Sequence, residues 1–114
     1  QKKIHIRSLK VKHGNVDCTC YIVDKKLAYI SDVSDINNKD FKFLKNLNYL
    51  VIDCLWYREH PAHLNLDKSL RLIDTLSPKK AILTNLHSDL DYNELKKKLK
   101  KNIVPAYDGM KINL

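Results

Sequence analysis

Several residues whose side chains can bind a metal ion stand directly behind hydrophobic, strand-like segments of this sequence. His13 follows the first such segment, Asp32 the third and His87 the fifth, while His60 and His63 come a few residues after the fourth. Neutral imidazoles and carboxylates are ligands for zinc, manganese and iron, and one carboxylate can bridge two ions. We therefore predict that Asp32 is a metal ligand with histidine partners. The alternative is that Asp32 caps a turn through its own backbone.

The elements that must position these residues can be predicted from the spacing of apolar positions. Alternation along the chain indicates strands, and apolar residues three and four apart indicate helices. In chain order, the predicted elements are strands at 3–12, 18–23 and 27–31, a helix at 37–47, a strand at 49–54, a helix at 65–76, a strand at 81–84, a helix at 91–101 and a hairpin at 103–114 around Asp108-Gly109. Asn65 and Asp91 stand where helix caps are expected.

The order of these elements fixes the direction of the strands. The first three strands form an antiparallel meander, and the later strands alternate with helices, which implies parallel pairing through right-handed crossovers. The first, third, fourth and fifth strands therefore end at the same edge of the sheet. His13, Asp32, His63 and His87 all follow these strand ends. Because ligands bind at the carboxyl ends of strands in open α/β sheets, this edge is the predicted site.

The composition bounds the kind of protein. The 114 residues are enough for one domain, and no apolar run is long enough to cross a bilayer. The chain begins with Gln-Lys-Lys and not with Met, so we expect that it is part of a longer polypeptide. Cys18, Cys20 and Cys54 are odd in number and contain no Cys-x-x-Cys pair, which argues against a disulfide scaffold or zinc ribbon and favours a reducing cytoplasm.

The formal charge of +8 raises nucleic acid as a partner. Counting the sequence gives 18 Lys, 3 Arg and 10 Asn, whereas a surface built to recognise phosphates and bases should favour Arg. We therefore favour a general compositional bias over a polyanion surface. The alternative class is a small basic RNA-binding module that uses the lysines of residues 96–101, although that run is also typical of a solvated helix face.

Four stretches of the sequence together resemble one protein family. They are SLKVKHGNVDCTCYIVDKKLAYISDVSDI, LVIDCLWYREHPAHLNLDKSLRLID, AILTNLHSDLDYNEL and PAYDGMKI, and they cover nearly all of the chain. In this order they are similar to the C-terminal half of metallo-β-lactamase-fold hydrolases, in particular the phosphoribosyl cyclic phosphodiesterase group related to tRNase Z. The resemblance implies an α/β fold that is half of an αββα sandwich. Residues 1–114 would then be the C-terminal portion of one domain.

The resemblance also implies a site and a chemistry. The family uses two divalent ions, zinc, manganese or iron, to activate a bridging water that attacks a small phosphodiester substrate. By position, His13 resembles a ligand of one ion, Asp32 the bridging carboxylate and His87 the last ligand, although many relatives have His where this chain has Asn85. His63 matches the residue that protonates the leaving oxygen, a role that suits an imidazole.

One departure from the family limits what this chain is expected to do. The motif His-x-His-x-Asp-His, which normally supplies four of the ligands, does not occur in the sequence. With His13, Asp32 and His87 alone, each ion would have fewer than the three protein ligands of a typical catalytic zinc site. We therefore expect a fragment that is inactive alone and that either self-associates through an uncovered sheet face or was released from an intact longer chain. A third class is an assembly module that has kept the fold without the chemistry.

Overall fold

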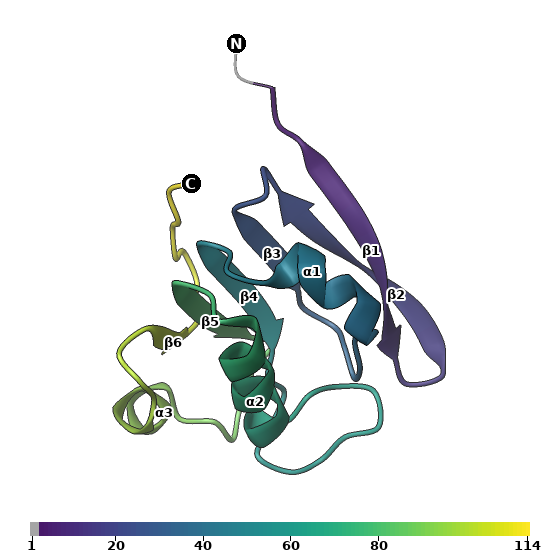
Figure 1. The fold of residues 1–114 in the computed structure, drawn as a ribbon. Coiled ribbons are helices and arrows are strands. Elements are labelled where there is room, and N and C mark those ends of the chain that lie inside the picture. The colour runs from purple at the N-terminus through teal and green to yellow at the C-terminus, as the bar shows by residue number, and fades with distance from the viewer. Residues whose placement is uncertain (1–2) are drawn as a thin grey trace.

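The computed structural model describes residues 3–114 and contains one six-stranded mixed sheet (Figure 1). The strands lie side by side in sequence order. β1 pairs with β2 and β2 with β3 in antiparallel fashion, and β3 to β6 are parallel. The strands are β1 (Ile6–His13), β2 (Val16–Val23), β3 (Leu27–Ile30), β4 (Tyr49–Asp53), β5 (Lys80–Thr84) and β6 (Ile103–Pro105).

The helices connect the parallel strands, and their ends follow from local capping residues. A 3-10 turn, η1 (Asn38–Asp40), leads into α1 (Phe41–Leu44), and the longer helices are α2 (Leu66–Leu76) and α3 (Tyr92–Lys98). The Asn65 side chain accepts a hydrogen bond from the Lys68 N–H at 2.9 Å and so caps α2. Asp91 caps α3 in the same way through the N–H of Glu94.

The two faces of the sheet differ. One face is covered by α1 and α2, which lie across it in Figure 1, and the core between them holds Ile30, Leu50 and Ile52 of the sheet and Leu44 and Leu76 of the helices. Since side chains alternate along a strand, the neighbouring positions point to the other face. There, paired residues form a row from Tyr21 through Tyr29 to Val51 and Ile82. Tyr21 and Tyr29 are each 46% exposed, so this face is partly open.

The predicted order and directions of the first five strands are confirmed, with shifts of a few residues at several ends. Two details were wrong. The predicted helix at 37–47 is only the short pair η1 and α1. The predicted hairpin at 103–114 is also absent from the described residues, where the segment forms β6 and then a turn with a Met110 N–H to Tyr107 C=O bond.

Both corrections have a local physical reason. Lys45 has an extended backbone with a ψ of 143°, which ends the helical path at Leu44, and Asn46 follows with a positive φ of 58°. Pro105 has no N–H to donate to a returning strand, so the chain leaves the sheet there.

Among residues 3–114, no helix has the length and apolar character needed to span a membrane.

Candidate metal centre

Three of the predicted residues come together at the carboxyl edge of the sheet. His13 ends β1, Asp32 lies two residues after β3, and His63 lies in the loop between β4 and α2. Each offers one ligand atom, and these atoms all lie within 4.8 Å of one another. The Nε2 atoms of His13 and His63 are 3.2 Å apart, and their rings meet edge to face. The topology predicted from the sequence therefore does place these groups together.

A buried carboxylate lies behind His63. Asp53, the last residue of β4, is fully buried, and its Oδ2 is 2.7 Å from Nδ1 of His63. The same oxygen accepts the N–H of Val33 at 3.0 Å. Burial raises the pKa of Asp53 above its ordinary value, while the hydrogen bonds from Val33, His63 and Asn85 act in the opposite direction. An Nδ1–H that donates to Asp53 leaves the lone pair of His63 on Nε2, facing His13.

The loop that carries His63 is held against the end of β1. Its base is closed by bonds from the Leu55 N–H to the Leu64 C=O and from the Leu66 N–H to the Trp56 C=O. Its tip approaches the β1–β2 turn at Gly14, which has a φ of +64° and where an added Cβ would lie 3.3 Å from the Cβ of Ala62. Glycine suits this position for both reasons, since it adopts positive φ freely and allows the close approach.

Asn85 also belongs to this group. Its Nδ2 lies 3.4 Å from Asp32 Oδ1 and 3.4 Å from Asp53 Oδ1, and it also lies 3.3 Å from the Ser31 carbonyl oxygen. Asn85 has a φ of +60°, a left-handed conformation that asparagine tolerates better than most residues. This local turn after β5 directs the amide toward Asp32. The side chain therefore joins the two carboxylates that end β3 and β4.

The structure does not bring His87 into the group of His13, Asp32 and His63. Its ring stacks on Trp56 with centroids 5.1 Å apart, and its Nδ1 accepts the Asp89 N–H at 3.1 Å. Its role as the last ligand thus stays a prediction. His60 stands nearer to the group, with its ring 5.1 Å from that of His63, and its Nδ1 accepts the Ala62 N–H.

Sequence reasoning missed Asp53 as a member of the candidate site, because it is the fifth residue of an otherwise apolar strand. One signal was available, since acidic residues are almost never fully buried without a partner. Nothing in the residue pattern indicates that His63, ten residues further on, is that partner. The position of His63 relative to Asp53 depends on the path of the irregular loop at residues 54–65.

The donor set fits a divalent metal ion. Two imidazoles and a carboxylate are the ligands expected for zinc, manganese or iron. The bond between His63 and Asp53 has the form that supports metal-bound histidines, in which the far ring nitrogen donates to a carboxylate. The mutual distances within 4.8 Å leave the three ligand atoms facing one space. These residues could hold an ion, although further ligands are needed to complete four-coordination.

No family model matches the chain. Among curated proteins, it is 28% identical over 108 residues to the octanoyltransferase of Porphyromonas gingivalis (strain ATCC BAA-308 / W83), a match that spans 92% of this chain but only 22% of that protein. The matching part is therefore a small share of that protein.

Solved structures show much stronger likeness in shape. A diphosphatase from the PhnP family superposes with a TM-score of 0.92 and 29% identity, over 96% of this chain and 43% of that chain. The metallo-β-lactamase-fold protein YhfI from Bacillus subtilis gives a TM-score of 0.75 at 20% identity, over 94% and 48%. The short form of human tRNase Z (ELAC1) gives 0.73 at 11% identity, over 96% and 42%. The chain thus spans less than half of each of these proteins.

The six-stranded α/β sheet and these superpositions identify the chain as half of a metallo-β-lactamase fold. Within that fold it is similar to the PhnP-family diphosphatase in sequence as well as in structure. The fold class and the family resemblance predicted from the sequence are therefore confirmed.

Proposed function

We propose that this chain supplies part of the active site of a metal-dependent hydrolase that cleaves phosphodiesters. The observation that carries the proposal is the group formed by His13, Asp32 and His63, with Asp53 buried behind His63. The likeness to a PhnP-family diphosphatase, at 29% sequence identity, supports the hydrolase class. The substrate we propose is a small phosphodiester.

His13 and Asp32 are the proposed metal ligands of this half. His13 is the last residue of β1, and Asp32 follows the end of β3 by two residues. The Ser31 hydroxyl donates to Asp32 Oδ2 at 3.1 Å and orients that carboxylate. A bound divalent ion would supply a Lewis acid and lower the pKa of a bound water. His87 is the proposed last ligand, and Asn85 is the alternative, although its NH₂ group is what faces Asp32 and the amide would have to turn its oxygen to an ion.

His63 is the proposed proton donor to the leaving oxygen. Asp53 holds the ring through Nδ1 and would stabilise the imidazolium that carries the proton on Nε2. The His63 side chain is 14% exposed; its Nδ1 is occupied by Asp53, and its Nε2 is directed at His13. Because His63 also belongs to the ligand group, it could bind an ion instead, and the two roles differ in whether its replacement releases metal.

The proposed site needs ligands from outside this chain. The superposed proteins are more than twice as long as the matched part, and the partly open sheet face with Tyr21 and Tyr29 is where a second layer or a second copy would pack. In the complete site we propose two divalent ions, zinc, manganese or iron, which Asp32 would help to hold.

The test is hydrolysis of a nitrophenyl phosphodiester by the full-length polypeptide that contains this chain, supplied with manganese or zinc. Asp32→Ala should abolish turnover, and a chelator should abolish it in the unchanged protein. Asp35→Ala is the matched control, since the described contacts of Asp35 with Lys12 are made by its backbone. Turnover that survives Asp32→Ala would contradict the proposal.

A further inference from the structure

A second charged feature lies at the opposite edge of the sheet, where the parallel strands begin. Each loop that enters a strand there carries exposed cations: Lys25 and Lys26 precede β3, Lys45 precedes β4, and Lys79 precedes β5. We define the basic edge as these four with five further exposed cations: Arg7, Lys42, Lys80, Lys100 and Lys101. The metal-ligand group lies at the carboxyl ends, so the two features are on different edges of the sheet.

The backbone fixes the loops of the basic edge relative to one another. The Tyr49 N–H donates to the Lys26 carbonyl, and the N–H groups of Lys79 and Lys80 donate to the carbonyls of Leu47 and Asn48. The Ala81 N–H likewise donates to the Asn102 carbonyl. The charges therefore stand on a rigid row across β3 to β6, which at strand spacing is roughly 15 Å long. In a mobile lysine-rich tail, the positions of the charges relative to one another would not be fixed.

A hollow of about 970 Å³ lies at one end of the row, beside β1 and α1. Its lining includes Arg7, Lys25, Lys42 and Lys45 together with the ring of Phe43. The Arg7 guanidinium lies 4.3 Å from the centre of that ring and the Lys42 ammonium 5.2 Å from it. These cation–π contacts hold positive groups around the hollow. One carboxylate, Asp24, also lines it, and its Oδ1 accepts the His5 N–H.

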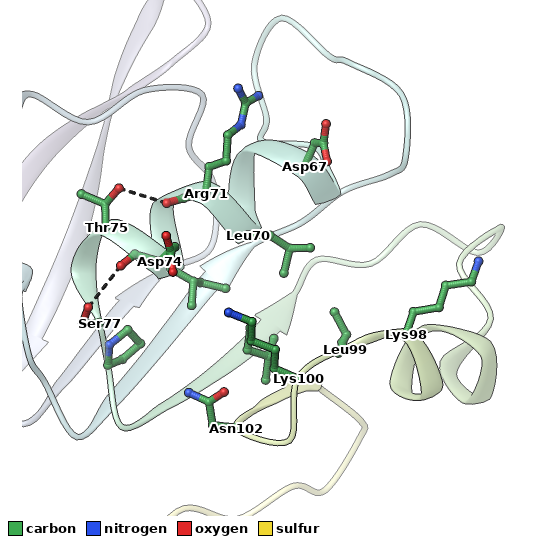
Figure 2. A pocket seen from close by; sticks show the side chains of 13 residues that line it. Asp67, Leu70, Arg71, Asp74, Thr75, Ser77, Lys98, Leu99, Lys100 and Asn102 are labelled. Atoms are coloured by element: carbon green, nitrogen blue, oxygen red, sulfur yellow. Dashed lines mark hydrogen bonds between the residues drawn. The ribbon is translucent and has the colours of Figure 1, made fainter.

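The other end of the row differs in charge. Figure 2 shows a pocket of about 760 Å³ between α2 and the segment around Lys100, with Asp67 and Asp74 on the helix side and Lys98 and Lys100 opposite them. Acidic and basic groups are mixed here, so a polyanion would meet repulsion as well as attraction. The favourable part of the basic edge is therefore the part from β1 to β5.

We propose that the basic edge binds the sugar–phosphate backbone of a nucleic acid. Lysine ammonium groups neutralise phosphates, and Asn46, Asn48 and Asn102 in the same loops offer amides that suit phosphate and sugar oxygens. A nucleic-acid strand laid along the part from β1 to β5, which at strand spacing is roughly 19 Å long, presents several phosphates to it. Leu47 is buried and the Phe43 ring is in contact with Arg7 and Lys42, whereas a membrane-binding surface presents free aromatic and aliphatic side chains, so nucleic acid is the favoured polyanion.

The basic edge is a different surface from most of the lysine run at residues 96–101. Within residues 96–101, Lys96 and Lys98 lie on α3, within 5.8 Å and 5.7 Å of the ring centres of Tyr92 and Tyr57. Only Lys100 and Lys101 reach the basic edge. The run is thus divided between two surfaces, and α3 offers a set of lysines for comparison.

The experiment measures the binding of a short fluorescent single-stranded RNA to the full-length polypeptide by anisotropy, between about 50 and 200 mM salt. The test variant carries Lys25→Gln, Lys45→Gln and Lys79→Gln. The control carries Lys10→Gln, Lys39→Gln and Lys96→Gln, which remove equal charge from exposed lysines elsewhere. We expect the test variant to bind about tenfold more weakly, with a salt slope reduced by about 2, and the control to bind as the unchanged protein does.

Three results would overturn the proposal. The first is an equal loss of affinity in both variants, which would mean that net charge alone attracts the RNA. The second is no binding by the unchanged protein at about 100 mM salt. The third is binding to vesicles that contain anionic phospholipid without binding to RNA. None of these depends on metal or turnover, so the result is separate from that of the proposed hydrolase.

Discussion

The carboxylate of Asp53 lies 2.7 Å from Nδ1 of His63, although the two residues come from different structural settings. Asp53 is fixed in the sheet, where it also accepts the Val33 N–H, while His63 comes from a loop. The contact joins the end of β4 to the candidate metal-ligand group, which is His13, Asp32 and His63. It also determines which nitrogen of His63 faces His13. Asp53 is thus a positioning residue whose effect passes through His63.

Replacement of Asp53 should affect His63 more than the fold. In Asp53→Asn the amide oxygen can still accept the Val33 N–H, but its NH₂ group can turn toward Nδ1 and favour the other tautomer of His63. We expect histidine NMR to show the proton on Nδ1 in the unchanged protein and on Nε2 in the variant. Phosphodiester turnover should fall about 100-fold, within the range of general acid catalysis.

One outcome of the tautomer measurement would contradict the positioning role of Asp53. If Asp53→Asn leaves the His63 proton on Nδ1 and turnover unchanged, the contact is only structural. Replacement of His63 by Gln then separates the two roles of that residue. Loss of turnover with metal retained is expected for a proton donor, whereas loss of bound metal would identify His63 as a ligand.

The position of the last ligand can be tested at two residues. Asn85 contacts Asp32, whereas His87 is stacked on Trp56. We expect Asn85→His to tighten divalent metal binding on the order of tenfold, or about 1.4 kcal/mol, because an imidazole binds zinc and manganese better than an amide does. His87→Ala should weaken metal binding, because it removes the proposed last ligand. Calorimetric titration would measure both, and an unchanged affinity in His87→Ala would exclude His87 as that ligand.

The buried thiols should be unreactive at neutral pH. Cys20 and Cys54 are 1% and 0% exposed, and burial raises the pKa of Cys20 to about 11 and that of Cys54 to about 12. Because these values lie above the ordinary thiol pKa, the stability from the neutral thiols is present below that pKa and is lost as the pH rises through about 11 to 12.

Alkylation with iodoacetamide, followed by peptide mass spectrometry, would check this. The partly exposed Cys18 should be modified first, and all three cysteines should react in denaturant. Modification of Cys54 as fast as Cys18 in the folded protein would show that the end of β4 opens readily.

The edge that carries His13 and Asp32 could be predicted from the sequence because strand direction follows from connection order. A strand period of two residues puts alternate positions on one face, so periodicity cannot decide between Asn85 and His87. The left-handed backbone at Asn85 directs its amide toward Asp32, and this conformation has no apolar pattern from which it could be predicted. The pairing of Asp53 with His63 depends on the path of an irregular loop, which hydrophobic spacing also does not encode.

The central claim is that Asp32 binds metal, and its most direct test is metal content. The full-length polypeptide, its Asp32→Ala variant and the Asp35→Ala control would each be loaded with zinc or manganese, dialysed and analysed for bound metal. We expect stoichiometric metal in the unchanged protein and the control, and a clear loss in Asp32→Ala. Equal metal retention in all three proteins, or none in any of them, would contradict the account.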